Sequence, residues 1–211
     1  MLSALMLAAA LTGTRLAPLA GAIEHYRTVA TYRVTLRSSH ADGEDHIRYY
    51  YKKPGFVRME FIRPHAGAVL VYSPLTRRVR LWPYVAGRFP ELGLSPHNSL
   101  IRGPGGQTVD KSDVGALFEN VRTLLEQGQA EVRGEARMED GRTALHLVVT
   151  GAKGGAVASV HRYELWLDTS SQFPIKVISR NQEDAIIETV MMDALEINAP
   201  LPETLFNPEG E

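Results

Sequence analysis

The chain contains no cysteine. This absence excludes disulfide frameworks, thiolate metal sites and thiol catalysis, and it leaves no cysteine for a lipid anchor. An excess of charge of one sign is also lacking, because 23 Lys and Arg stand against 24 Asp and Glu, for a formal net charge of −1. A balance of this kind gives no electrostatic footprint for nucleic acid, so we expect no nucleic-acid partner.

Long hydrophobic runs are confined to the N-terminus. Leu2–Leu11 is an apolar run, and Ala20-Gly21-Ala22 is a small-residue cleavage pattern. Spanning a bilayer needs ~20 apolar residues, so this run is too short, but it is typical of a signal peptide. We expect residues 1–22 to be a signal peptide and residues 23–211 to be one exported domain that is soluble, periplasmic and not lipid-anchored. The alternative is an N-terminal amphipathic helix that belongs to the fold.

The remaining composition is that of an ordinary globular domain, with 44% hydrophobic and 22% charged residues. From Ala30 onward the dominant period is two, as in Tyr32, Val34 and Leu36, which alternate with Arg33 and Arg37. The same signal predicts ten strands, at residues 30–36, 47–51, 57–61, 68–72, 79–81, 130–138, 143–149, 163–167, 175–177 and 186–197. Short turns join them, and this favours antiparallel neighbours.

The middle of the chain breaks this pattern. Pro83–Thr108 has no periodicity and holds four prolines and five glycines, so we expect a long irregular loop that is functional or lid-like. Ser112 is the expected N-cap of the one clear helix, with Asp113 in its first turn and Gly128 at its end. The apolar positions of that helix are Val114, Leu117, Phe118, Val121, Leu124 and Leu125. A weaker helix is predicted over Ile23–Val29.

These elements predict a mainly β fold, a curved antiparallel sheet or half-open barrel of about ten strands with one or two helices on its apolar face. A helix of roughly 16 residues is only ~24 Å long and cannot cover such a sheet. Either the sheet fills itself, or it encloses a hydrophobic cavity with the helix and the long loop as lid. The expected cavity lining is Val34, Leu36, Tyr49, Tyr51, Val57, Met59, Phe61, Leu81, Leu165 and Leu167. The expected lid residues on the helix are Leu117, Phe118, Val121 and Leu124.

No enzyme signature is present. The seven histidines form no metal-ligand pattern, and the His40–His46 cluster of His, Asp and Glu lies in an expected hairpin turn. His146 and His161 lie on or beside neighbouring strands, but no G-x-S-x-G elbow accompanies them. Gly103-Pro104-Gly105-Gly106 lacks the Lys-Ser/Thr ending of a phosphate loop. We therefore expect no enzymatic activity, no cofactor and no metal.

One basic cluster is open to two interpretations. Arg77, Arg78 and Arg80 lie beside the aromatic Trp82, and they form either an anion or lipid-headgroup site or a solvated strand face. The solvated strand face is the interpretation that we favour.

Several short motifs together resemble LolA-like periplasmic lipoprotein carriers, a superfamily that includes LolB-like and RseB-like proteins. In the first half they are Lys53-Pro54-Gly55-Phe56-Val57-Arg58-Met59-Glu60-Phe61, Val69-Leu70-Val71-Tyr72 and Val79-Arg80-Leu81-Trp82. In the second half they are Tyr163-Glu164-Leu165-Trp166-Leu167-Asp168, Phe173-Pro174-Ile175-Lys176-Val177 and Asn198-Ala199-Pro200-Leu201-Pro202 before Phe206. The likeness covers most of residues 23–211.

The resemblance implies a half-open barrel whose helices cover a hydrophobic cavity that receives acyl chains. It also implies that a basic residue before the strand-opening proline latches the lid. Lys53 occupies that position, where the carriers have an arginine with its rigid fork of donors. The expected function is that of a soluble, monomeric carrier of a lipid or a lipidated protein, served by a membrane-bound donor or acceptor protein.

Two alternatives come from other classes. The first is an RseB-like regulatory module that binds a membrane or anti-sigma partner through the basic strand faces and an exposed Trp82. The second is a hydrolase or lyase that uses His146 or His161. The absence of a cysteine after the apolar run disfavours the anchored, LolB-like members.

Overall fold

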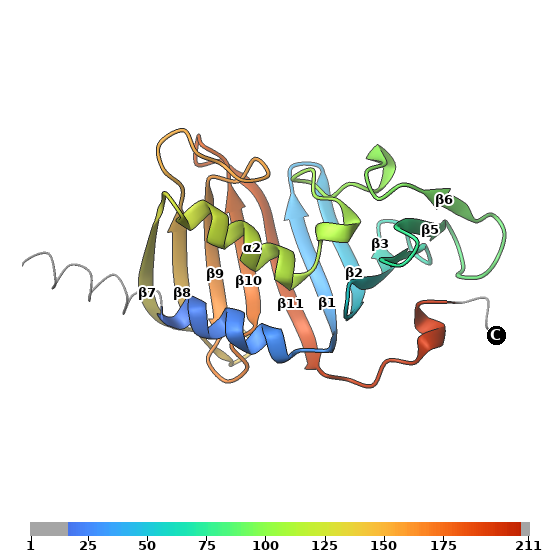
Figure 1. The fold of residues 1–211 in the computed structure, drawn as a ribbon, viewed down its shortest axis with the longest axis horizontal. Coiled ribbons are helices and arrows are strands. Elements are labelled where there is room, and N and C mark those ends of the chain that lie inside the picture. Colours follow the sequence, from blue (N-terminus) through green and yellow to red (C-terminus); the bar gives the residue numbers. More distant parts are fainter. Residues whose placement is uncertain (1–16, 208–211) are drawn as a thin grey trace, which may run out of the picture.

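A computed structural model describes residues 17–207, which form one open, curved antiparallel sheet (Figure 1). Its strands are β1 (Thr31–His40), β2 (Gly43–Lys52), β3 (Phe56–Arg63), β4 (Val69–Ser73), β5 (Arg78–Trp82), β6 (Leu92–Leu94), β7 (Gln129–Arg137), β8 (Thr143–Thr150), β9 (Arg162–Asp168), β10 (Pro174–Arg180) and β11 (Ile186–Ile197). Their order is β6-β5-β4-β3-β2-β1-β11-β10-β9-β8-β7. Two meanders therefore meet where β1 pairs with β11, and the predicted fold class is confirmed.

The alternation of apolar and charged residues decides which face of the sheet is buried. On β1, Tyr32 and Val34 are buried on the concave face. Arg33 and Arg37 point to the other face, where they pair with Glu196 and Asp193 of β11. All ten predicted strands are present. The period of two was sufficient to find them because one face of each strand is packed and the other is in water.

The eleventh strand, β6, lies inside the stretch that the sequence predicts to be irregular. It pairs with β5 through Leu81 and Leu92. The rest of that stretch contains a 3-10 turn at Ser99–Ile101, and a second turn, Val109–Lys111, precedes the helix. A strand of three residues, Leu-Gly-Leu, is too short to produce an alternation signal.

Two helical elements lie on the same face of the sheet (Figure 1). One is α2 (Val114–Leu125), and the other spans residues 17–28. The predicted N-cap of α2 was wrong by one residue: Asp113 has the extended backbone of an N-cap, and its carboxylate accepts a hydrogen bond from Gly115 N. Ser112 instead ends the preceding turn in a helical conformation, and its hydroxyl donates to the Val109 carbonyl.

The helix at residues 17–28 includes most of the predicted weak helix at Ile23–Val29, but it begins earlier. Leu19, Ala22 and Tyr26 are buried in the main core beneath it. Residues 1–16 of the predicted signal peptide lie outside the described part of the chain. None of the helices within residues 17–207 is long and apolar enough to cross a membrane.

A second, smaller hydrophobic cluster lies on the opposite face of the sheet. The C-terminal segment, residues 198–207, brings Phe206 against Val69, Val71 and Trp82. The carbonyl of Leu205 accepts a hydrogen bond of 2.8 Å from the guanidinium of Arg58. Trp82 is only 1% exposed, so the expectation of an exposed Trp82 was wrong. The strand pattern placed Trp82 on the outer face correctly, but it could not show that the C-terminal segment covers that face.

Candidate functional site

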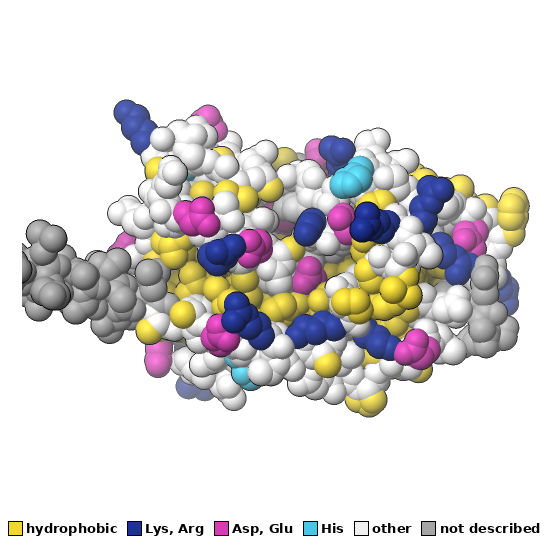
Figure 2. Space-filling model, viewed as in Figure 1, with side chains coloured by type: hydrophobic (Ala, Val, Ile, Leu, Met, Phe, Trp, Pro, Cys, Tyr) yellow, Lys and Arg dark blue, Asp and Glu magenta, His cyan; other side chains and the backbone are white. Residues whose placement is uncertain are grey.

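A cavity of about 800 Å³ lies between the concave face of the sheet, the first half of α2 and the segment 99–113. The strands contribute the apolar side chains Leu36, Ile47, Tyr49, Met59, Phe61, Leu70 and Leu81 to its wall. The opposite side consists of Ile101, Val109, Val114 and Leu117, among others. Figure 2 shows hydrophobic side chains gathered in a band across this side of the molecule, bordered by charged side chains.

The structure divides the predicted cavity residues into two groups. Leu36, Tyr49, Met59, Phe61 and Leu81 line the cavity, and so does Leu117 of the predicted lid. The remaining side chains lie in the packed core beneath the helices: Val34, Tyr51, Val57, Leu165, Leu167, Phe118, Val121 and Leu124. The two possibilities left open by the sequence therefore coexist, with a filled core where the helices rest and a cavity beside them.

The loop at Pro83–Thr108 lies where a lid would lie. Its residues Pro83, Leu92 and Gln107 line the cavity, together with the run from Ser99 to Pro104. The cavity therefore has one wall of regular strand and one wall of irregular chain.

Tyrosine side chains connect the sheet to the start of α2. The Tyr26 hydroxyl donates to the Asp113 carboxylate at 2.7 Å, and the Tyr49 and Ser112 hydroxyls are 3.0 Å apart. The Tyr32 oxygen accepts from Val114 N at 3.2 Å. Burial raises the pKa of Tyr26 and of Tyr49, and Asp113 raises both further. The phenols therefore stay protonated, and they hold the N-terminus of α2 in place at the edge of the cavity.

Lys53 forms a connection of the kind that the resemblance implies, but to a different element. Its ammonium donates to the Arg27 carbonyl at 2.7 Å and lies 5.9 Å from the ring of Tyr26. Both partners belong to the helix at residues 17–28 and not to α2. A carbonyl at a helix C-terminus is a favourable partner for a cation.

Polar residues in the cavity wall were missed by the sequence reasoning. Ser38 and His40 of β1, Asp45 of β2, Ser179 of β10 and Glu188 of β11 all line it. The sequence did indicate their position, because each lies an even number of residues from the inward apolar residues of its strand and therefore shares their face. Glu188, for example, precedes Val190 and Met192 on the inward face.

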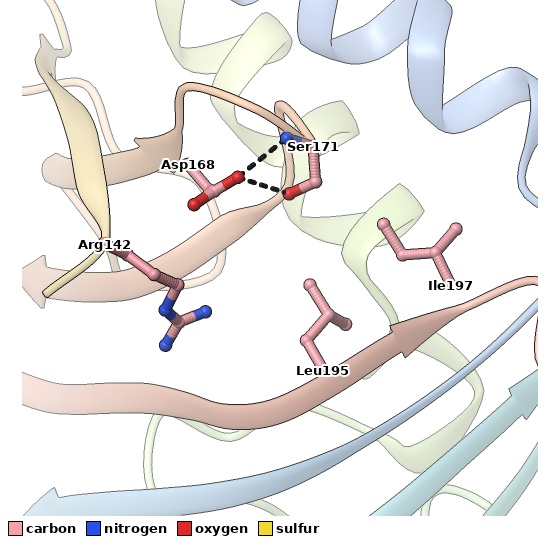
Figure 3. Close-up of a pocket in the computed structure, with 5 residues that line it drawn as sticks. All are labelled: Arg142, Asp168, Ser171, Leu195 and Ile197. Carbon is pink, nitrogen blue, oxygen red and sulfur yellow. Dashed lines mark hydrogen bonds between the residues drawn. The ribbon is translucent and has the colours of Figure 1, made fainter. Parts of the chain in front are cut away.

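A second, smaller pocket of about 270 Å³ lies near the β9–β10 turn and is shown in Figure 3. Its walls are Arg142, Asp168, Ser171, Leu195 and Ile197. The Asp168 carboxylate accepts from the backbone and hydroxyl of Ser171 at 2.7 and 2.9 Å, and Arg142 donates to the Met192 carbonyl at 3.1 Å. These bonds close the turn, so the polar groups of this pocket have structural partners.

The two histidines considered for catalysis are held in different surroundings. His146 stacks on Trp166 with ring centroids 4.1 Å apart, on the outer face of the sheet, and its Nε2 lies 3.4 Å from Glu164. His161 lies just before β9, with its Nδ1 2.6 Å from the Gly155 carbonyl. The structure therefore does not bring the two imidazoles to one site.

No family model matches the sequence, and no curated protein matches it. Among solved structures, the Mycobacterium tuberculosis lipoprotein LppX aligns at 9% identity with a TM-score of 0.55, over 90% of this chain and 98% of its own. An uncharacterized conserved protein from Thermus thermophilus aligns at 14% identity with a TM-score of 0.54, over 90% of both chains.

A chain of the Pseudomonas aeruginosa MucA/MucB complex aligns at 18% identity with a TM-score of 0.51, over 88% of this chain and 60% of its own. The chain shares the fold of these proteins. The predicted resemblance is confirmed at the level of the fold. At identities of 9–18%, these likenesses show a shared fold and do not show a shared function.

Proposed function

We propose that this chain is a carrier that holds an acyl chain of a lipid or lipoprotein in the cavity without covalent chemistry. The observation that carries the proposal is the cavity itself, which at about 800 Å³ has the size of a ligand site and is lined mainly by aliphatic and aromatic side chains. Each CH₂ group that leaves water for such a wall contributes about 0.8 kcal/mol. A long acyl chain therefore binds tightly and still leaves when a partner offers a better site.

The proposal includes export to the periplasm after removal of residues 1–22, which leaves a soluble protein with no lipid anchor. Cleavage after Ala22 would remove Leu19 and Ala22, which are 5% and 1% exposed in the helix at residues 17–28. The intact mass of protein recovered from the periplasm of an expression host tests this directly. The expected N-terminus is Ile23, and a mass that includes residues 1–22 would contradict it.

Ligand binding is tested by native mass spectrometry of the protein as purified, with organic extraction of whatever it holds. A titration with an uncharged, pyrene-labelled acyl amide gives the affinity. Met59→Trp puts a bulkier side chain into the cavity and should weaken probe binding, because Met59 lines the wall. Ile62→Trp is the matched control, since Ile62 lies on the same strand and is 37% exposed outside the core. No extracted lipid and no probe uptake by the unmodified protein would overturn the proposal.

A second candidate function is that of an interaction module that binds a membrane-bound partner. It is supported by the match to the MucA/MucB complex and by exposed apolar side chains on the loop beside the cavity. Tyr84 and Phe89 of that loop are 69% and 95% exposed. Large apolar side chains exposed to this extent are available for contact with a partner. A Tyr84→Ser, Phe89→Ser variant should lose a protein partner in pull-down while it keeps acyl binding.

A further inference from the structure

A row of polar side chains crosses one part of the cavity wall on four neighbouring strands. Ser179 of β10 is the cross-strand partner of Glu188 of β11, and Glu188 is the partner of His40 of β1. Ser38, also on β1, is the partner of Asp45 on β2. All five side chains line the cavity, and together they are the polar row.

The wall beside the polar row is apolar. On each of the four strands, the residue two positions from the polar row is apolar. These residues occupy the same face and also line the cavity: Val177, Val190, Leu36 and Ile47. Two residues of a strand span about 7 Å, so the apolar wall begins within one side-chain length of the polar row. The cavity wall therefore has an apolar region next to a polar edge, which matches the two parts of an amphiphilic ligand.

Glu188 is the acidic residue that β11 contributes to the row. Its Oε1 accepts a hydrogen bond of 2.5 Å from the hydroxyl of Ser38, a residue that is 7% exposed. Among residues 17–207 it forms no ion pair. Burial raises the pKa of Glu188, the Ser38 hydrogen bond and His40 oppose that shift, and Asp45 adds to it. The carboxylate is thus partly desolvated and has no ion-pair partner within residues 17–207.

The neighbouring imidazole of His40 contacts other groups. His40 Nε2 lies 3.1 Å from the Asp45 carboxylate, and His40 Nδ1 accepts from the backbone N–H of Asp42 at 3.3 Å. Asp45 and Asp42, which also line the cavity, add negative charge to this edge.

The basic groups of the cavity wall lie on other elements. Arg102 and Lys111 come from the segment 99–113, and His65 comes from the β3–β4 turn. The guanidinium of Arg102 is bonded to the His97 carbonyl at 3.1 Å. None of the three forms an ion pair with Glu188 in the described part of the chain.

From this arrangement we propose that the polar row is the head-group site of the cavity, and that it selects amphiphiles whose polar end donates hydrogen bonds. An ammonium head group is preferred over a neutral hydroxyl or amide, and either is preferred over a carboxylate. The inference rests on the proposed function, because it concerns the same cavity, and it adds the chemical class of the ligand.

The physical reason is the environment of the two carboxylates. An ammonium in the row donates to Glu188 and Asp45 and gives Glu188 an ion-pair partner, and charge-assisted hydrogen bonds of this kind are the strong ones. A neutral donor satisfies the open oxygen of Glu188 without charge neutralisation. A carboxylate adds a third negative charge beside two others in a partly dry site, where like charges repel strongly.

The test is a competition experiment at pH 7.4 on the whole protein, in which dodecylamine, dodecanol and laurate displace the uncharged pyrene-labelled acyl amide. The three competitors share a twelve-carbon chain by design, so differences in their affinity report on the head group. We expect dodecylamine to displace the probe at a concentration about tenfold or more below that of laurate, as hydrogen bonds to charged groups predict. Dodecanol should fall between them.

Glu188→Gln should reduce the ratio of the two affinities by about fivefold or more, chiefly by weakening dodecylamine. Glu196→Gln is the matched control, because Glu196 lies on the outer face of the same strand and pairs with Arg33. Equal affinity for all three competitors, a preference for laurate, or an unchanged ratio in Glu188→Gln would overturn the inference alone. Failure of the probe itself to bind would overturn the proposed function and this inference with it.

Discussion

The hydroxyl of Tyr26 donates to the carboxylate of Asp113 across 2.7 Å, and the two residues are 87 positions apart in the chain. Asp113 also caps α2 through Gly115 N, so one carboxylate joins both helices that cover the sheet. We expect Tyr26→Phe and Asp113→Ala each to lower the free energy of unfolding by about 1–2 kcal/mol, through the lost hydrogen bond and the lost cap. Urea denaturation of the two single variants and the double variant measures the coupling. Strictly additive losses would contradict a direct interaction.

Lys53 should hold the helix at residues 17–28 against the sheet. Lys53→Met keeps the alkyl chain but removes the donor to the Arg27 carbonyl, so we expect a loss of about 1 kcal/mol. Amide hydrogen exchange should become faster across residues 23–28 and stay unchanged in β9. Lys53→Arg restores a donor and should exchange like the unmodified protein. Equal protection in Lys53→Met would show that the hydrogen bond does not hold the helix.

Much of the fold could be predicted because the alternation of apolar and polar residues within each strand shows which of its faces is buried. The alternation on β1 identified Tyr32 and Val34 as inward residues and Arg33 as outward. The predictions that were wrong concerned residues whose burial depends on contacts with distant parts of the chain. The alternation places Trp82 on the outward face, but the C-terminal segment brings Phe206, Leu201 and Leu205 to the cluster that buries it.

The site was predictable in part for the same reason. Parity places Val57 and Met59 on the same face of β3, but it cannot show that Val57 is packed in the core while Met59 faces a cavity. That distinction depends on where two helices come to rest, which is a property of tertiary packing. Glu188 was overlooked because a charged residue on an inward face reads as an interruption of the pattern until its neighbours Ser38 and Ser179 are placed beside it.

His146 should make stability depend on pH. Its pKa is lowered chiefly because burial disfavours the charged ring, although Glu164 opposes this. The unfolded chain therefore gains a proton near pH ~6.5 that the folded chain does not bind, so the free energy of unfolding falls as the pH drops below that value. Denaturation at pH 7.5 and 5.5 should show a larger loss for the unmodified protein than for His146→Gln. His25→Gln, at an exposed position, is the control. Identical losses in all three proteins would contradict this assignment.

The C-terminal segment should contribute to stability through Phe206. This ring packs on Phe56 with centroids 5.8 Å apart and covers Trp82. Phe206→Ala should cost about 3 kcal/mol, as expected when a buried aromatic side chain is removed. The chain has two tryptophans, so a Trp166→Phe background isolates the emission of Trp82, which should shift to the red when the cover is lost. Thr204→Ala, an exposed change in the same segment, should leave both stability and emission unaltered.

Substitution by alanine should affect mainly stability at one residue of β3 and mainly ligand affinity at another residue on the same face. Val57 is 2% exposed in the main core, so Val57→Ala should lower the free energy of unfolding by about 2 kcal/mol and leave the affinity for the acyl probe nearly unchanged. Met59 lines the cavity, where one side of its chain already lacks packing partners. Met59→Ala should therefore cost less than about 1 kcal/mol in stability but weaken the probe, because buried methylene contacts with the ligand are lost. Urea denaturation and probe titration of the two variants separate these effects. Similar stability losses at both positions would show that Met59 is packed like Val57 and that the cavity does not extend to β3.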